Sequence, residues 1–378
     1  MNILIDIFIR CCPVNFSSPM VSAKQRFVFS LLLSLTATVL VVKAQESCPY
    51  TSFTWVAHQE DNPYFWKSPS FGWNATSTIA VFGDITDSQD RIDMRDYAHS
   101  IGVSVITATS PGDIDMGNDT QKQEWINQVV TRISDQGLDG VNVDYEGHDP
   151  RRTEDYNDVT VELCDAMHES IPGSKVSIDV PIYPEYEGRN YDYARMASSC
   201  DSLFVMGYDG EFWDNVQCTV TGAPCSLACA SLQMLEFGIQ KYLEAGVPAS
   251  KLVLGVPWYG LKYEYVLGVP FFTGQLQYKY VLEVVRNAGD SGKMRMDEAS
   301  STWVFDCGGK CSQWSDQIDD MSTEIWYDDP TSLAPKYALA TKYGLQGVGM
   351  WESTHVDYDP EGDSPDADAM WDSLCQRG

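Results

Sequence analysis

The chain has 378 residues, with 54 acidic residues against 25 Lys and Arg and a formal net charge of -29. Apolar residues make up 44% of it, which is enough for a large core and excludes an acidic disordered protein. The acidic balance argues against a nucleic-acid partner and against an anionic membrane surface, because little positive charge is present to neutralise phosphates.

An apolar stretch spans residues 27–42, directly after Lys24 and Arg26. Val42-Lys43-Ala44 ends it with small residues at the two positions that a signal peptidase reads, so we expect cleavage after Ala44. The alternative is a membrane anchor, but the stretch is short for a span of ~20 apolar residues. Translation starting at Met20 would make residues 1–19 an upstream extension.

The expected domain organisation follows from that leader. Residues 1–44 are predicted to be an extension and signal peptide that is removed, and residues 45–378 to be a single domain. We expect a monomer of the secretory pathway that is not attached to a membrane after cleavage. Two sequons, Asn74-Ala-Thr76 and Asn118-Asp-Thr120, are predicted glycosylation sites on the surface.

Cysteine usage supports the same compartment. Of 11 cysteines, Cys11 and Cys12 belong to the leader, and the remaining nine predict mainly disulfides, with at least one thiol left over. Cys307 and Cys311 flank two glycines and predict a pinched loop. Three closely spaced cysteines at 218, 225 and 229 are alternative zinc ligands, but no His or paired CxxC motif accompanies them, so we expect no metal site.

Short apolar runs recur along the chain, and several are followed by helical patterns. Runs this apolar predict a parallel sheet covered by helices. The predicted strands are 52–57, 77–83, 103–109, 137–144, 175–181, 202–206, 251–257 and 347–351, and the helices between them include 120–135, 153–170, 231–245 and 333–343.

Eight strands in about 300 residues predict a (β/α)8 TIM barrel. The alternative is an open doubly wound sheet, but its GxGxxG fingerprint and a phosphate-binding GxxxxGK[ST] motif are both absent. The connection 258–346 between the seventh and eighth strands is long and rich in aromatic residues, which predicts an insertion there.

Residues 139–146 read DGVNVDYE and end the fourth predicted strand. Alternate side chains of a strand share a face, so Asn142, Asp144 and Glu146 point one way and their apolar neighbours the other. In a barrel the apolar set suits the helix layer. The polar set then faces the interior near the carboxyl ends of the strands, where barrel enzymes keep their active sites.

Two carboxylates held close together raise the pKa of one of them. One acid then stays protonated near neutral pH, which is what breaking a glycosidic bond requires. The alternative is a solvated acidic strand end, which is common in a chain this acidic. The whole DGxNxDxE string is far more specific than a bare DxE.

This string resembles the DGxDxDxE signature of glycoside hydrolase family 18. Segment 203–209 (LFVMGYD) resembles the MxYD segment of the family's sixth strand, segment 251–260 resembles its seventh strand, and 326–330 and 347–351 resemble later segments. The similarity runs from about residue 50 to 358 and thins within 258–322.

The resemblance implies substrate-assisted hydrolysis of β-1,4 N-acetylglucosamine linkages, in which the N-acetyl oxygen of the sugar attacks the anomeric carbon. Glu146 is then the acid and base, Asp144 holds the acetamido N–H, and Tyr208 donates its hydroxyl to the acetamido oxygen. No cofactor is needed. The remaining implied substrate-binding residues are Asn142, Met206, Asp209, Trp258 and Trp351, with Trp351 flooring a subsite.

Three positions of the motif need a separate interpretation. We expect Asp139 to be orienting or structural and Gly140 to be a close-packing position. Asn142 departs from the family pattern, which has Asp there. Because Asn cannot carry charge, we expect it to keep Asp144 ionised to lower pH.

Four functions remain open at this point. The first is an exo-acting lysosomal hydrolase of the chitobiose core of asparagine-linked glycans, where only the resemblance implies the lysosome. The second is a secreted endochitinase or endo-β-N-acetylglucosaminidase. The third is an inactive chitin-binding lectin and the fourth a structural secreted protein. Lectins on this barrel typically lack the terminal acid, so the presence of Glu146 favours an enzyme.

Overall fold

The computed structural model describes residues 51–57, 64–147, 149–210 and 225–375. Every described residue belongs to one compact unit, Ser47–Gly378. The predicted leader, together with Cys48, His148 and Cys218, lies outside the described residues.

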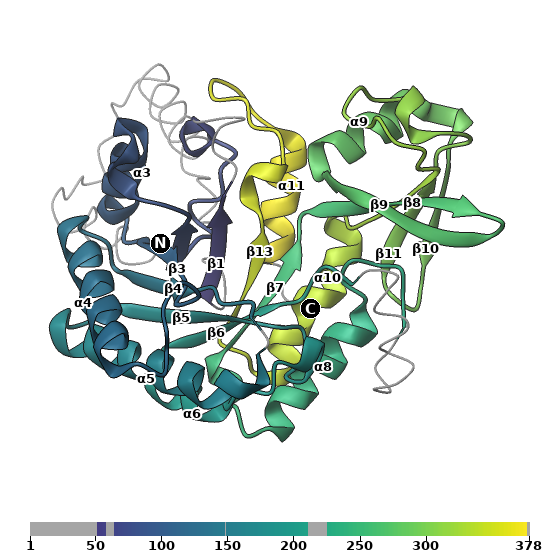
Figure 1. The fold of residues 1–378 in the computed structure, drawn as a ribbon. Helices are drawn as coiled ribbons and strands as arrows, with labels where there is room; N and C mark the ends of the chain where they lie inside the picture. Colours follow the sequence, from purple (N-terminus) through teal and green to yellow (C-terminus); the bar gives the residue numbers. More distant parts are fainter. Residues whose placement is uncertain (1–50, 58–63, 148, 211–224, 376–378) are drawn as a thin grey trace, which may run out of the picture. The chain divides into compact units, whose positions relative to one another are not determined.

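Eight parallel strands close into a barrel in the order β1-β13-β7-β6-β5-β4-β3-β2 (Figure 1). Each predicted strand coincides with one of them, apart from shifts of a few residues at the ends. The predicted barrel is confirmed, and the open doubly wound alternative is wrong. The barrel strands are β1 (Thr51–Val56), β2 (Thr78–Val81), β3 (Ser104–Thr109), β4 (Gly140–Val143), β5 (Lys175–Val180), β6 (Ser202–Met206), β7 (Leu252–Pro257) and β13 (Gly347–Trp351).

Helices follow the strands and surround the barrel (Figure 1). The α-helices of the described residues are α3 (Gln89–Ser100), α4 (Asp119–Asp135), α5 (Thr153–Ser170), α6 (Tyr193–Ser199), α8 (Leu232–Glu244), α9 (Tyr278–Ala288), α10 (Pro330–Tyr343) and α11 (Pro365–Leu374). Local chemistry sets their ends. Asn118 Oδ1 accepts hydrogen bonds from the first backbone N–H groups of α4, and Gly344, with φ 65°, ends α10 in the left-handed conformation.

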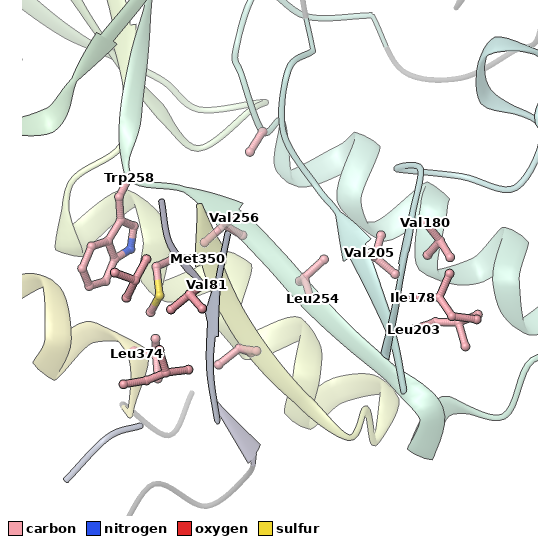
Figure 2. Close-up of a cluster of buried hydrophobic side chains, with 14 of the residues drawn as sticks. Val81, Ile178, Val180, Leu203, Val205, Leu254, Val256, Trp258, Met350 and Leu374 are labelled. Carbon is pink, nitrogen blue, oxygen red and sulfur yellow. The ribbon is translucent and has the colours of Figure 1, made fainter. Parts of the chain in front are cut away.

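The strands bury two separate apolar layers, as their period of two requires. One layer packs between the strands and the helices and includes Leu254, Val256 and Met350 (Figure 2). A smaller cluster fills the barrel interior and includes Phe53, Trp55, Ala80, Ile106, Ala108, Phe204 and Val253. On β4, the two valines of the motif join the outer layer, whereas Asn142 is fully buried and bonds Ser177 and Asp179 of β5.

An insertion follows β7 and precedes β13, as predicted, and it forms a second sheet. Its five antiparallel strands, in the order β10-β11-β12-β8-β9, accompany α9. The strands are β8 (Tyr259–Val266), β9 (Val269–Gln277), β10 (Lys293–Asp297), β11 (Thr302–Asp306) and β12 (Glu324–Tyr327).

A buried ion pair joins this sheet to a barrel helix. Lys336 on α10 donates to both carboxylate oxygens of Asp328, at 2.6 and 2.7 Å, and to Thr302 Oγ1 of β11 at 2.9 Å. Both charged side chains are shielded from solvent. Because a buried charge without its partner is costly, this contact fixes α10 against the inserted sheet.

Disulfides reinforce the described domain. Cys164 pairs with Cys200, and Cys307 pairs with Cys311, which confirms the pinched loop. Cys225 also belongs to a disulfide, so it is not a zinc ligand, and Cys229 is buried and free among the described cysteines. Within the described ranges, no helix is both long enough and apolar enough to cross a bilayer.

Candidate active site

Three polar residues on two neighbouring strands lie inside the barrel. Asn142 of β4 donates from Nδ2 to Ser177 Oγ and to Asp179 Oδ1 of β5, each at 2.9 Å. All three side chains are buried. Sequence reasoning missed Asp179, although Ser177 and Asp179 alternate with three apolar residues in β5, which is the same inward phase that identified Asn142.

Asp144 follows directly after β4 and is partly buried. Burial, together with the charge of Glu146, raises the pKa of Asp144 to about 6, against the opposing effect of Arg189. Burial and the nearby charge of Asp144 raise the pKa of Asp179 as well. Because neighbouring carboxyl groups resist joint ionisation, the charge on one of these two acids disfavours the charged form of the other.

Glu146 is the most exposed acid of the motif's inward face, with 59% of its side chain accessible. Arg189 Nη2 contacts Glu146 Oε2 at 3.3 Å and Glu187 Oε2 at 2.8 Å. The Glu146 carboxyl can therefore reach a ligand at the barrel mouth while a guanidinium holds one of its oxygens. Arg189 has no motif that would have identified it from the sequence.

Tyr208 continues the inward phase of β6, after Phe204 and Met206, and it packs against the interior cluster. Burial raises the pKa of Tyr208 well above its ordinary value, and the charges of Asp179, Asp209, Asp144 and Glu146 raise it further. These four carboxylates lie on β5 or directly after β4 and β6, and all of them act on the same tyrosine. Tyr208 therefore stays protonated and can donate a hydrogen bond.

Asp209 links the barrel to the inserted sheet. Its Oδ1 accepts hydrogen bonds from the hydroxyl of Tyr259 on β8 and from Gln275 Nε2 on β9, the latter at 2.8 Å. Its backbone N–H donates to Cys229 Sγ at 3.3 Å. Asp209 has φ 61°, a conformation that is uncommon outside glycine, so these contacts hold it in an otherwise disfavoured geometry.

Trp351, at the end of β13, is half-buried beside Tyr208 and Trp55. Its ring centroid lies 6.4 Å from that of Tyr208 and 5.4 Å from that of Trp55. Its partial exposure leaves part of the side chain accessible next to Tyr208. Met206 is also partly buried and packs onto the interior cluster.

The prediction that Trp258 binds substrate is wrong. Trp258 continues the outward phase of Leu254 and Val256, so its side chain lies in the layer between strands and helices (Figure 2). It is fully buried, its Nε1 donates to Tyr337 at 3.1 Å, and its ring packs edge-on against Trp371.

Asp139 and Gly140 lie at the opposite end of β4 from Glu146. Asp139 Oδ2 accepts a hydrogen bond from the backbone N–H of Val105 at 2.7 Å and bonds His99 at 2.9 Å. A Cβ added to Gly140 would stand 1.8 Å from the carbonyl oxygen of Lys175, so only glycine fits there. Neither residue belongs to the group of acids that act on Tyr208, which are Asp144, Glu146, Asp179 and Asp209.

The two sequon asparagines, Asn74 and Asn118, are both exposed. Within the described ranges, no cluster of three or more His, Cys, Asp and Glu side chains could hold a metal ion. The chemistry that this site offers is that of its acids, its tyrosine and its aromatic side chains.

The family model of glycosyl hydrolases family 18 matches residues 104–357, which include the β4 motif, Tyr208 and Trp351. The chain belongs to this family. It is a glycoside hydrolase, similar to di-N-acetylchitobiase of Rattus norvegicus (28% identity, covering 93% of this chain and 98% of that protein). It is also similar to di-N-acetylchitobiase of Homo sapiens (29% identity, 82% and 80%).

Solved structures of glycosyl hydrolase barrels share the fold of this family 18 chain. A chitinase from Chromobacterium violaceum superposes with a TM-score of 0.65 at 18% identity, covering 86% of this chain and 98% of that one. At this identity the likeness concerns the arrangement of the barrel and not the substrate.

Proposed function

We propose that this family 18 enzyme hydrolyses β-1,4 N-acetylglucosamine linkages, in chitooligosaccharides and in the chitobiose core of asparagine-linked glycans. The observation that carries the proposal is that Asp144, Glu146 and Asp179 all lie near enough to Tyr208 for their charges to raise its pKa, with Asn142 bonded to Asp179 and Arg189 to Glu146. A proton donor, a charge-stabilising carboxylate and a neutral hydroxyl are the groups that substrate-assisted cleavage of an N-acetylated sugar needs. Relatives named di-N-acetylchitobiase support the choice of substrate.

In the proposed mechanism, Glu146 protonates the oxygen of the leaving sugar as the glycosidic bond breaks. The N-acetyl oxygen of the substrate attacks the anomeric carbon and forms a cyclic oxazolinium intermediate, so no enzyme nucleophile is required. Glu146, now ionised, then takes a proton from the water that opens this ring. The two displacements together retain the anomeric configuration.

Asp144 and Tyr208 orient the attacking acetamido group. Asp144 accepts its N–H and its charge stabilises the positive intermediate, while the Tyr208 hydroxyl donates to its oxygen. Asp209 binds a sugar hydroxyl or the acetamido group, and Trp351 stacks on the sugar ring beside the scissile bond. Asn142 and Met206 support these groups from within the barrel.

We also propose that residues 1–44 are removed as a leader and that residues 45–378 form a monomeric catalytic barrel of the lysosome or the extracellular space. The apolar run before Ala44 and the disulfides of the described domain support entry into the secretory pathway. Asn74 and Asn118 would then be accessible for glycosylation.

Chitotriose with a free or a chemically reduced end tests this proposal. We expect the protein to hydrolyse the unreduced sugar, with products followed by chromatography. An exo enzyme that requires a free reducing end leaves the reduced sugar intact, whereas an endo-acting enzyme cleaves both. Binding without cleavage of either sugar would indicate a lectin and contradict the proposal.

Asn142→Asp should move the acid limb of the pH profile of kcat/KM to higher pH by at least about one unit. The pKa of Asp144 is already raised to about 6, and the ionised form of Asp144 is the active one. A new carboxylate beside Asp179 adds a like charge and favours the protonated form of Asp144. As the pH falls, activity is therefore lost at a higher pH than in the wild type. Asn127→Asp on the exposed face of α4 is the matched control, and an unmoved limb in Asn142→Asp would refute the role assigned to Asn142.

A further inference from the structure

Arg189 is a buried cation in the segment after β5, with 5% of the residue exposed. Its Nη2 atom contacts Glu146 and Glu187. Its Nε and Nη1 atoms are buried and have no hydrogen-bond partner among the described residues. Only part of the guanidinium is therefore satisfied within this part of the chain.

A buried guanidinium with unpartnered N–H groups lowers the free energy of unfolding, because burial removes water from donors that then lack other partners. An apolar side chain of similar length would fill the same space without that cost. Features that break a local stability rule concentrate at functional sites, and Arg189 breaks the rule directly beside Glu146.

We propose that Arg189 is a positioning residue of the active site: its guanidinium holds the Glu146 carboxyl at the barrel mouth and supplies positive charge to the surrounding acidic groups. This inference rests on the proposed function of Glu146 and Asp144. It assigns the segment after β5 a role in the reaction that neither the β4 motif nor the resemblance in β6 provides.

The segment that carries Arg189 is tied to the end of the β4 motif at a second point. Tyr191 donates its hydroxyl to the carbonyl oxygen of Gly147 at 2.5 Å, one residue beyond Glu146. Tyr193 donates to the carbonyl oxygen of Arg189 at 3.0 Å and packs edge-on against Tyr242 of α8. The backbone around Arg189 is therefore fixed, so the position of the guanidinium sets the position of the Glu146 carboxyl.

The charge of Arg189 acts on a crowded acidic group. It lowers the pKa of Asp144, against burial and the charge of Glu146, which both raise it. Glu146 acts on the pKa of both Asp144 and Arg189, and Glu187 acts on that of Arg189. The charge of Asp144 or Arg189 in turn acts on the pKa of Asp179, Tyr156, Tyr208, Tyr191, Tyr193 and Tyr242. Glu146 and Asp179 both disfavour a charged Asp144, and Arg189 opposes them.

Arg189→Met tests the proposal, with Arg195→Met as the matched control, because Arg195 pairs with Asp158 on the surface. In Arg189→Met we expect the acid limb of kcat/KM for chitotriose to move to higher pH by roughly one unit. Arg189→Lys keeps the positive charge, so the acid limb of its pH profile should stay near that of the wild type. Its kcat should fall, because an ammonium cannot reproduce the planar geometry of the guanidinium. The control should match the wild type.

Two further measurements separate this role from a structural one. The Tm of Arg189→Met should be unchanged or higher, since the half-satisfied guanidinium is removed. The 13C titration of the Asp144 carboxyl, followed by NMR, should shift upward in Arg189→Met alone. The NMR result needs no turnover, so it decides the inference even where the wild type fails to cleave chitotriose and the proposed function falls. A folded Arg189→Met protein in which the Asp144 titration does not shift overturns the inference. A lower Tm together with an unchanged acid limb of kcat/KM also overturns it.

Discussion

Glu146→Gln should lower kcat for chitotriose by on the order of 10³-fold or more while leaving binding nearly intact. Gln has almost the same shape and retains a contact with Arg189, but it carries no transferable proton. Without that proton the departing sugar leaves as an alkoxide, which is a poor leaving group. Steady-state kinetics and calorimetric titration with chitotriose measure the two effects separately.

Glu187→Gln is the matched control for this substitution. Glu187 contacts the same Arg189 nitrogen as Glu146, at 2.8 Å, but lies outside the β4 motif. Its replacement should change kcat only slightly. Turnover of Glu146→Gln close to that of the wild type would remove Glu146 from the acid role and leave the proposed mechanism without a proton donor.

Asp144→Asn is expected to reduce kcat by on the order of 10²-fold, the usual cost of losing one electrostatic contact to the transition state. The amide oxygen of Asn can still accept the acetamido N–H, so KM should change little. What is lost is the negative charge that stabilises the positively charged intermediate. The acid limb that we assign to Asp144 should also disappear from the pH profile.

Asp139→Asn is the control for that experiment, because Asp139 lies on the same motif but at the other end of β4. It should leave kcat near the wild-type value and lower Tm, since it weakens the contacts to Val105 and His99. If Asp139→Asn and Asp144→Asn reduce kcat equally, the loss reflects a disturbed strand and not the lost charge of Asp144.

The barrel could be predicted because its strands are short, nearly continuous apolar runs, several of them followed by helical patterns, and because side chains along a strand alternate between faces with a period of two. That period also placed Asn142 inside the barrel and its two valine neighbours outside. Helix α3 was not among the helices named from the sequence. Only Met94 and Ala98 of its twelve residues are buried, which leaves a weak apolar pattern. The five strands of the insertion have mixed exposure and no common pattern, so the sequence indicated an insertion but not its sheet.

The site itself was only partly predictable. The residues of the β4 motif and Tyr208 belong to recognisable local strings. In contrast, Asp179, Arg189 and Gln275 contact Asn142, Glu146 and Asp209, respectively, from distant segments that carry no motif. Trp258 illustrates the opposite error. An aromatic residue next to a recognised segment is an attractive ligand contact, yet its phase along β7 sends it into the outer layer.

The hydrogen bonds from Tyr259 and Gln275 to Asp209 have a practical consequence for protein engineering. They make the inserted sheet part of the scaffold that shapes a barrel residue, so the insertion is not an exchangeable module. A chimaera that transplants this segment from a homologous hydrolase must bring a tyrosine and an amide to the same two places, or the recipient loses the orientation of its own aspartate.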